Sequence, residues 1–254
     1  MKVTFLGTGT SQGVPIIACD CEVCNSKDPR DRRLRSSVLI HYNDLQIIID
    51  TGPDFRQQML REKVTQLDAV VFTHEHKDHT AGFDDIRGFN WKDKKPMEVY
   101  GNQQVELALK RDFHYAFSEK KYPGVPSLNL HIIDNQTFEI QGTPIIPIEV
   151  MHYKLPVLGF RIGDFTYITD ANFISEEEKE KIRGSKVLVL NALKKSEHIS
   201  HFSLKEAMVL ADELDVEKTY FTHISHHMGF HENVSEELPS HMELAYDELQ
   251  IHID

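Results

Sequence analysis

The sequence has few cysteines and no long apolar run. Its only cysteines are Cys19, Cys21 and Cys24, three thiols within six of the 254 residues. The N-terminus has no basic segment followed by an apolar run, so we expect no signal peptide, and no stretch approaches the roughly 20 apolar residues of a membrane span. We therefore expect a cytoplasmic protein without a membrane partner. In a reducing compartment, clustered thiols bind metals more often than they form disulfides.

Positive charge is scarce. The chain has 28 Lys and Arg against 40 Asp and Glu, a formal net charge of -12. This balance disfavours binding to a long nucleic acid, because neutralising many phosphates requires clustered cations. A small anionic substrate stays possible, since a metal can hold it. The basic run RDRRLR at 30–35, together with Arg56 and Arg87, predicts either a solvated face or a contact with a substrate phosphate.

Short apolar runs rich in Val, Ile, Phe, Tyr and Thr predict many strands, such as KVTFLG, LQIIID, LDAVVFT and TPIIPIEVM. Helical periodicity predicts helices over 54–62, 103–113 and 203–214. The last begins with Ser203 and Glu206 in capping-box spacing. No internal repeat, low-complexity tract or linker divides the chain, so we expect a single domain over 1–254 in which helices cover layered sheets.

The strongest chemical signal is HEHKDH, which follows the apolar run LDAVVFT. A buried strand that ends here would place His74, His76, Asp78 and His79 in one loop. The i, i+2 spacing of the first two histidines suits one ion, and the next pair follows closely enough to serve a second. Imidazole and carboxylate together suit Zn²⁺, Mn²⁺ or Fe²⁺. The alternative interpretation is a solvated polar loop.

Other metal-competent residues follow other predicted strands: Asp50, His152, Asp170 and His223. Taken singly, a histidine at the end of a strand is more often a satisfied surface or core group. Taken together, the order of Asp, H-x-H-x-D-H, His, Asp and His resembles the metallo-β-lactamase superfamily over nearly the whole chain.

The resemblance implies an αββα sandwich, in which two mixed sheets lie face to face and helices flank them. It also implies two divalent ions, zinc or manganese. One ion would be held by His74, His76 and His152, and the other by Asp78, His79 and His223. Asp170 would bridge both ions, and Asp50 would support the ligand loop without binding a metal. Two ions roughly 3.5–4 Å apart need a shared anionic ligand and can share a hydroxide nucleophile.

The cysteine segment CDCEVC narrows the resemblance. With His226, three residues after His223 in THISHHMGFH, it is similar to the PhnP-type phosphodiesterases. That similarity implies a separate structural zinc, held by Cys19, Cys21, Cys24 and His226, in a Cys-rich insertion near 15–35. A closed four-ligand site leaves no position for substrate. His227 is an alternative fourth ligand, and three free thiols in a surface loop are the alternative to any zinc.

His201 in HISHFSLKEA matches a histidine that this family uses to stabilise the transition state and protonate the leaving group. Histidine suits both tasks near neutral pH. The alternative is a structural residue at the start of a helix, and His198 is a weaker candidate from the same stretch. Asp78 joins His201 as a candidate catalytic residue in addition to its role as a ligand.

These features predict an enzyme, a metal-dependent phosphoric diester hydrolase. The resemblance implies a small, possibly cyclic ribose, phosphodiester as substrate, attacked by a metal-activated hydroxide, and a homodimer. Three alternatives remain: a transfer-RNA 3′-processing endonuclease, a thioesterase or glyoxalase-like hydrolase, and a non-catalytic zinc-stabilised interaction module.

Overall fold

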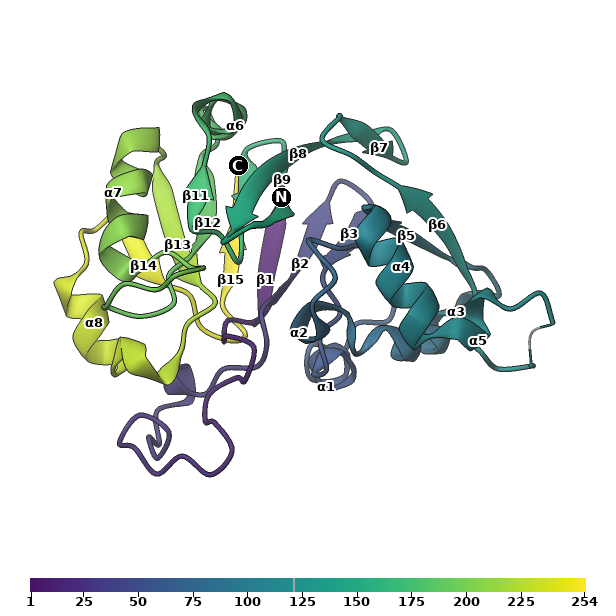
Figure 1. Ribbon diagram of the computed structural model, residues 1–254, viewed down its shortest axis with the longest axis horizontal. Helices are drawn as coiled ribbons and strands as arrows, with labels where there is room; N and C mark the ends of the chain where they lie inside the picture. Colours follow the sequence, from purple (N-terminus) through teal and green to yellow (C-terminus); the bar gives the residue numbers. More distant parts are fainter. Residues whose placement is uncertain (121) are drawn as a thin grey trace.

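Two mixed β-sheets lie face to face in the computed structural model, with helices on the outer side of each sheet (Figure 1). The structure describes residues 1–120 and 122–254. This arrangement confirms the αββα sandwich expected from the sequence. Among the described residues, no helix combines the length and the hydrophobicity that crossing a bilayer requires.

The first sheet has the strand order β15-β1-β2-β3-β4-β5-β6. In chain order its strands are β1 (Lys2–Gly7), β2 (Ser37–Tyr42), β3 (Leu45–Ile49), β4 (Ala69–Val71), β5 (Met97–Gly101), β6 (Leu128–Ile132) and β15 (Gln250–His252). Asn43 and Asp44 form the turn between β2 and β3, and Asn43 has a φ of 54°. Asparagine tolerates this left-handed backbone, which suits a tight hairpin. From β3 to β6 the strands run parallel, so β3 and β4 end at the same edge.

The second sheet has the order β11-β8-β9-β10-β12-β13-β14, and β7 pairs with β8 outside this path. Its strands are β7 (Phe138–Ile140), β8 (Thr143–His152), β9 (Leu155–Ile162), β10 (Phe165–Tyr167), β11 (Phe173–Ile174), β12 (Val187–Asn191), β13 (Lys218–Thr222) and β14 (Met242–Leu244). The pairs β10–β12, β12–β13 and β13–β14 are parallel.

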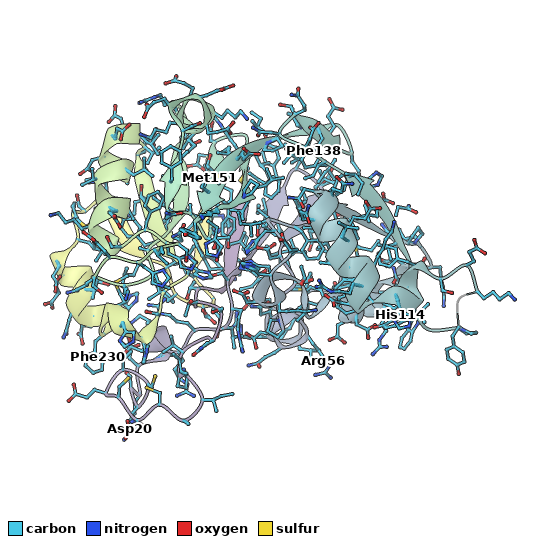
Figure 2. The ribbon with its side chains drawn as sticks, in the orientation of Figure 1. Asp20, Arg56, His114, Phe138, Met151 and Phe230 are labelled. Carbon is cyan, nitrogen blue, oxygen red and sulfur yellow. The ribbon has the colours of Figure 1, made fainter. Side chains whose placement is uncertain are left out.

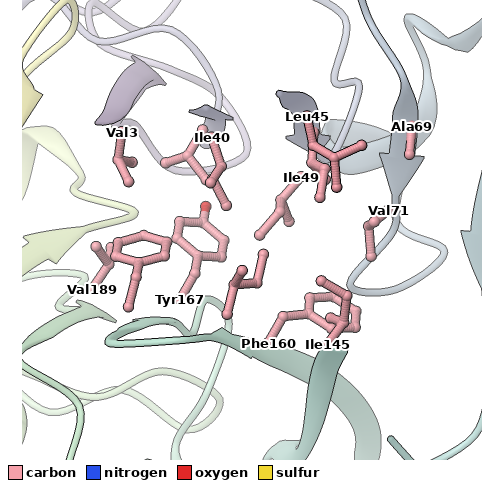
Figure 3. Close-up of a cluster of buried hydrophobic side chains, with 14 of the residues drawn as sticks. Val3, Ile40, Leu45, Ile49, Ala69, Val71, Ile145, Phe160, Tyr167 and Val189 are labelled. Atoms are coloured by element: carbon pink, nitrogen blue, oxygen red, sulfur yellow. The ribbon is translucent and has the colours of Figure 1, made fainter. Parts of the chain in front are cut away.

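The inner faces of the two sheets form the central core. Val3, Ile40 and Ile49 of the first sheet belong to one buried cluster with Phe160 and Tyr167 of the second (Figure 3). One further cluster lies between the first sheet and its helices, and another lies between the second sheet and its helices. Burial on both faces explains why the strands read as continuous apolar runs in the sequence.

Helices cover both outer faces. On the first sheet lie α1 (Phe55–Arg61), α2 (Lys77–Thr80), η2 (Phe83–Ile86), α3 (Arg87–Asp93), α4 (Gln103–Asp112) and α5 (His114–Phe117). The second side carries α6 (Glu176–Ile182), α7 (Leu204–Leu214) and α8 (His231–Glu237), and the short turns η1 (Pro29–Asp31) and η3 (His226–Met228) complete the set. The capping box of α7 is confirmed: Ser203 and Glu206 exchange side-chain and backbone hydrogen bonds.

Some strands are shorter than their apolar runs, because side chains replace the sheet as hydrogen-bond partners. After β4, Thr73 N donates to the carboxylate of Asp50, and after β10, Ala171 N donates to the amide oxygen of Asn191. Helical periodicity of apolar residues is absent from the sequence of α6. That helix starts at the N-cap Ser175, and its buried side chains are only Glu178 and Ile182, so no apolar stripe marks it.

Candidate metal centres and active site

The buried carboxylate of Asp50 anchors the loop that carries HEHKDH. Asp50 accepts hydrogen bonds from Thr73 N (2.9 Å), Thr73 Oγ1 (2.8 Å) and His79 Nδ1 (2.7 Å). Because the carboxylate accepts a hydrogen bond from Nδ1–H, the neutral ring of His79 carries its lone pair on Nε2, where it can bind a metal. Asp50 is thus in place for the supporting role predicted from the sequence.

Three imidazoles lie together where the first ion is predicted. His74 Nε2 is 3.0 Å from His76 Nδ1, and the ring of His152 lies 5.3 Å from that of His76. In two of these rings Nδ1 already has a hydrogen-bond partner. His74 Nδ1 contacts Thr73 Oγ1, and His152 Nδ1 donates to Ser200 O. Burial lowers the pKa of His74 well below its usual value, so this ring is neutral. Its free lone pair is what a cation requires.

The second group contains Asp78, His79, Asp170 and His223, whose potential ligand atoms all lie within 4.8 Å of one another. His79 Nε2 is 3.2 Å from carboxylate oxygens of both Asp78 and Asp170. Burial opposes charge on these groups, but the carboxylates raise the pKa of His79 well above its usual value. The histidines in turn lower the pKa of Asp78 and of Asp170. Both carboxylates are therefore ionised at neutral pH.

Asp170 connects the two groups. It belongs to the cluster with Asp78, His79 and His223, and also to a second cluster with His152 and His201. The backbone at Asp170 and at His223 is left-handed, with φ of 56° at each, and Asp50 has a φ of 65°. Non-glycine residues in this region are strained, and such strain concentrates at functional sites.

The donor set fits divalent metal ions. Imidazole nitrogens and carboxylate oxygens converge in two adjacent groups that share one carboxylate, which is the ligand chemistry of Zn²⁺, Mn²⁺ and Fe²⁺. The assignment of His74, His76 and His152 to one ion, and of Asp78, His79 and His223 to the other, stays a prediction. The rings of His74, His76 and His152 lie within 6.0 Å of one another, and Asp170 shares one ligand group with His152 and another with Asp78, His79 and His223.

The three cysteines lie around one histidine. The Sγ atoms of Cys19, Cys21 and Cys24 are 3.4, 3.3 and 3.4 Å from His226 Nδ1. Tetrahedral zinc bonds of roughly 2.0–2.3 Å place sulfur and nitrogen ligands about 3.5 Å apart, so this spacing suits a Cys₃His zinc site. The group contains His226 and not His227, and it shares no residue with the other groups.

The cysteine-bearing segment lies on the same side of the molecule as α8. In Figure 2, Asp20 lies near Phe230, the residue before that helix. A hydrogen bond of 2.7 Å from His231 N to the Asp31 carboxylate links this segment to α8.

Comparisons with known proteins identify the superfamily and the family. The profile of a β-lactamase superfamily domain matches residues 46–224. A solved structure described as a new diphosphatase from the PhnP family is 38% identical, with a TM-score of 0.93, and the match covers 100% of this chain and 98% of that one. The chain belongs to the PhnP family. Membership of this metallo-β-lactamase family identifies it as a metal-dependent hydrolase.

Two further comparisons bear on this PhnP-family chain. A protein of Porphyromonas gingivalis named octanoyltransferase is 38% identical over 257 residues, which cover 100% of this chain and 52% of the relative. The chain thus spans about half the length of that curated relative. Zn²⁺-bound PqqB from Methylobacterium extorquens is 18% identical with a TM-score of 0.80, covering 100% of both chains, and shares the fold.

His201 lies inside the site, whereas His198 lies at its edge. His201 is 8% exposed, and its ring lies 4.6 Å from that of His152 and 4.9 Å from that of His223. Its Nδ1 has no hydrogen-bond partner among the described residues and lies 3.9 Å from an oxygen of Asp170. Burial, followed by repulsion from His223, lowers the pKa of His201 to about 3. The His201 ring is therefore neutral near pH 7 in the free site.

Three of the four arginines of the basic run have partners outside the site, and the fourth, Arg32, is exposed. Arg30 pairs with Asp28, and Arg35 pairs with Asp54. Arg33 is 4% exposed and donates to Ala245 O, so this position is neither a solvated face nor a phosphate contact. Its partner follows it by 212 residues, a separation at which sequence reasoning had no signal.

Two residues that the sequence reasoning missed hold the site together. Ser200 O accepts from His152 Nδ1 and so orients a predicted ligand. Asn172 accepts from Tyr153 N at 2.7 Å and donates to Ile199 O at 3.2 Å, which joins the turn after β8 to the loop before α7. The only signal in the sequence was their proximity to His201 and Asp170.

Proposed function

We propose that the chain is a dinuclear metal-dependent phosphodiesterase that acts on a small diester. The observation that carries this proposal is the position of Asp170, which belongs to the cluster of Asp78, His79 and His223 and also to that of His152 and His201. Bound divalent ions at such a site would activate water as a nucleophile and offset charge on phosphate oxygens.

The protein's own groups set the charge of this site. Asp78 and Asp170 are ionised, while burial keeps His74 neutral, so two divalent ions would leave the site net positive. A phosphodiester carries one negative charge and would be attracted there. His201, neutral in the free site, lies beside His152 and His223, and its Nδ1 has no partner in the part of the chain that the structure describes. From this position it can donate a hydrogen bond to an oxygen of the substrate.

The substrate class follows from the relative and from the surroundings of the site. The PhnP-family structure at 38% identity is described as a diphosphatase, so diphosphates belong beside cyclic ribose phosphates among the candidates. Several arginines of the basic run are already paired or buried, which supports a small substrate over a long nucleic acid.

We also propose a homodimer, which light scattering of the purified chain would test.

The deciding experiment is a hydrolysis panel. Protein freed of metal and reloaded with Zn²⁺ or Mn²⁺ would be assayed against cyclic ribose phosphates, diphosphate diesters, nitrophenyl diesters and a precursor transfer RNA. Turnover of small diesters that depends on the added metal supports the proposal. Cleavage confined to the transfer RNA would support the endonuclease. If no substrate is turned over, the result would support a non-catalytic, zinc-stabilised interaction module.

A second candidate, an acyl thioester hydrolase, is favoured by one observation. The curated relative named octanoyltransferase matches this chain over only 52% of its length, so its name can describe either half of that protein. An octanoyl thioester therefore belongs in the same panel. Hydrolysis of the thioester without hydrolysis of any phosphodiester would favour this candidate.

A further inference from the structure

A cavity of about 490 Å³ opens directly beside the first group of histidines. Its lining contains His76 and His152, together with Tyr153, Lys154, Leu155, Ile199 and Ser200. Because two predicted metal ligands line it, a molecule whose phosphate is held by the ions would extend into this cavity. His201 directly follows Ser200, and its ring lies 4.6 Å from that of His152, which lines the cavity.

The lining combines apolar surface with one unpaired cation. Tyr153 is 50% exposed and Ile199 is 67% exposed, although both border a site of charged and polar groups. Lys154 Nζ lies 5.2 Å from the centre of the Tyr153 ring and forms no ion pair within the described part of the chain. An exposed ring can stack against a planar group, and an ammonium without an ion pair can attract an anion beside it.

Hydrogen bonds fix the backbone of the two loops, at residues 153–155 and at 199–200, that form this wall of the cavity. Tyr153 has a left-handed backbone with a φ of 59°, and its N–H is fixed by the side chain of Asn172. The same side chain donates to Ile199 O, so the two loops that form the wall are tied to each other. Pre-ordered groups lose less entropy when a ligand binds.

A larger cavity elsewhere is lined by none of the predicted metal ligands. The cavity of about 950 Å³ between α6 and α7 contains Lys179 and Lys195. Lys179 is paired with Glu176 and Glu213, and Lys195 is paired with Glu237. Lys205 also lines this cavity and forms no ion pair in the described part of the chain, but a phosphate bound there would not contact the predicted metal ligands.

We propose that Tyr153, Ile199 and Lys154 recognise a ring-bearing diphosphate, such as a nucleoside diphosphate ester. This inference rests on the proposed function. The reacting phosphate would lie at the metal ligands, the second phosphate at Lys154, and the planar base against Tyr153 and Ile199. Tyr153 and Lys154 would then determine specificity without taking part in the chemical step.

Binding of ADP, AMP, pyrophosphate and phosphate to the metal-loaded protein tests this assignment by titration calorimetry. Tyr153→Asn removes the ring with a residue that tolerates a left-handed backbone. It should weaken ADP and AMP by about 5- to 100-fold, the range of base–aromatic stacking, and leave pyrophosphate unchanged. Lys154→Gln should weaken ADP and pyrophosphate by about two- to fivefold, less so at high salt, and leave phosphate unchanged.

Tyr153→Phe, which keeps the ring, and Lys205→Gln, an exposed lysine on α7, are the matched controls and should bind all four compounds like the wild type. Wild-type protein that binds ADP no more tightly than phosphate would overturn the assignment, as would unchanged ADP binding in both test variants. These binding measurements need no turnover. A chain that hydrolyses no diester but shows the expected binding pattern would lose the proposed function and keep the nucleotide site.

Discussion

His201 stacks on His223, with ring centroids 4.9 Å apart and planes inclined by 25°. His223 is a predicted metal ligand and His201 is the predicted donor to the leaving group. Stacking holds the two imidazoles in a fixed relation, and burial keeps His201 uncharged in the free site. A phosphate bound beside it would supply the negative charge that favours the protonated ring.

Removing His201 should affect poor leaving groups most. His201→Ala should slow hydrolysis of an alkyl or sugar diester by about 10²–10⁴-fold. A nitrophenyl diester should slow much less, because nitrophenolate leaves without a proton. Steady-state rates on both substrates, with metal content measured in parallel, check this. His198→Ala is the control, since His198 is exposed at the edge of the site. Equal slowing on both substrates would instead assign His201 to stabilising the phosphoryl oxygens.

The cysteine site should support folding rather than the chemical step. Cys21→Ser should remove about one zinc per chain and lower the unfolding temperature, because a structural zinc contributes up to about 10 kcal/mol in small peptides and less where a large core exists. Metal analysis and thermal unfolding measure both effects. Protein that stays folded should keep much of its activity, and Asp20→Asn in the same loop should change nothing. A thermally unchanged but inactive Cys21→Ser variant would contradict this role.

Asp50 should control metal affinity without binding metal. In Asp50→Asn, an amide must replace a carboxylate that accepts from Thr73 N, Thr73 Oγ1 and His79 Nδ1, so His79 loses its orienting partner. We expect metal affinity to fall by about 10- to 100-fold, as measured by competition with a chelator. Asp44→Asn, in the exposed turn between β2 and β3, is the control. Unchanged affinity in Asp50→Asn would reject the supporting role.

His231 should make the protein less stable in mild acid. Arg33 Nη2 lies 3.2 Å from His231 Nδ1, and an arginine can only donate, so this nitrogen must accept. Burial, followed by repulsion from Arg33, lowers the pKa of His231 to about 4, below the value of 6.5 expected in the unfolded chain. The unfolded state therefore binds the proton first, and this stability is present above pH 6.5 and is lost as pH falls toward 4.

Chemical unfolding at several pH values between 7 and 4 would measure this loss, which should reach about 1–3 kcal/mol. In His231→Asn an amide oxygen can accept from Arg33 but cannot be protonated, so the acid-dependent loss should shrink. His252→Asn, on the exposed face of β15, should retain the wild-type slope. Identical slopes in the wild type and in His231→Asn would exclude His231 as the source.

The sequence was most informative where one local segment carries several groups. HEHKDH supplied His74, His76, Asp78 and His79 within six residues, and CDCEVC supplied the three thiols. Apolar runs predicted the layered sheets, because buried strands need side chains that are apolar on both faces. The capping box of α7 was equally local.

Contacts between distant segments were not visible in the sequence. Nothing local distinguishes Arg33, buried against Ala245 O, from an arginine in solvent, and nothing marks Asn172 as the link between Tyr153 and Ile199. The same holds for the Tyr153–Lys154 wall of the cavity, whose neighbours Ile199 and Ser200 are brought to it by the folded sheet.

The sequence by itself therefore determined the kinds of metal-binding groups and their order along the chain, because spacing and residue chemistry are local properties. Only the tertiary structure decided that Asp170 joins two ligand groups, that His201 and not His198 lies inside the site, and that His226 and not His227 meets the thiols. These outcomes depend on where strand ends from two different sheets meet, and that position is set by the packing of the whole sandwich.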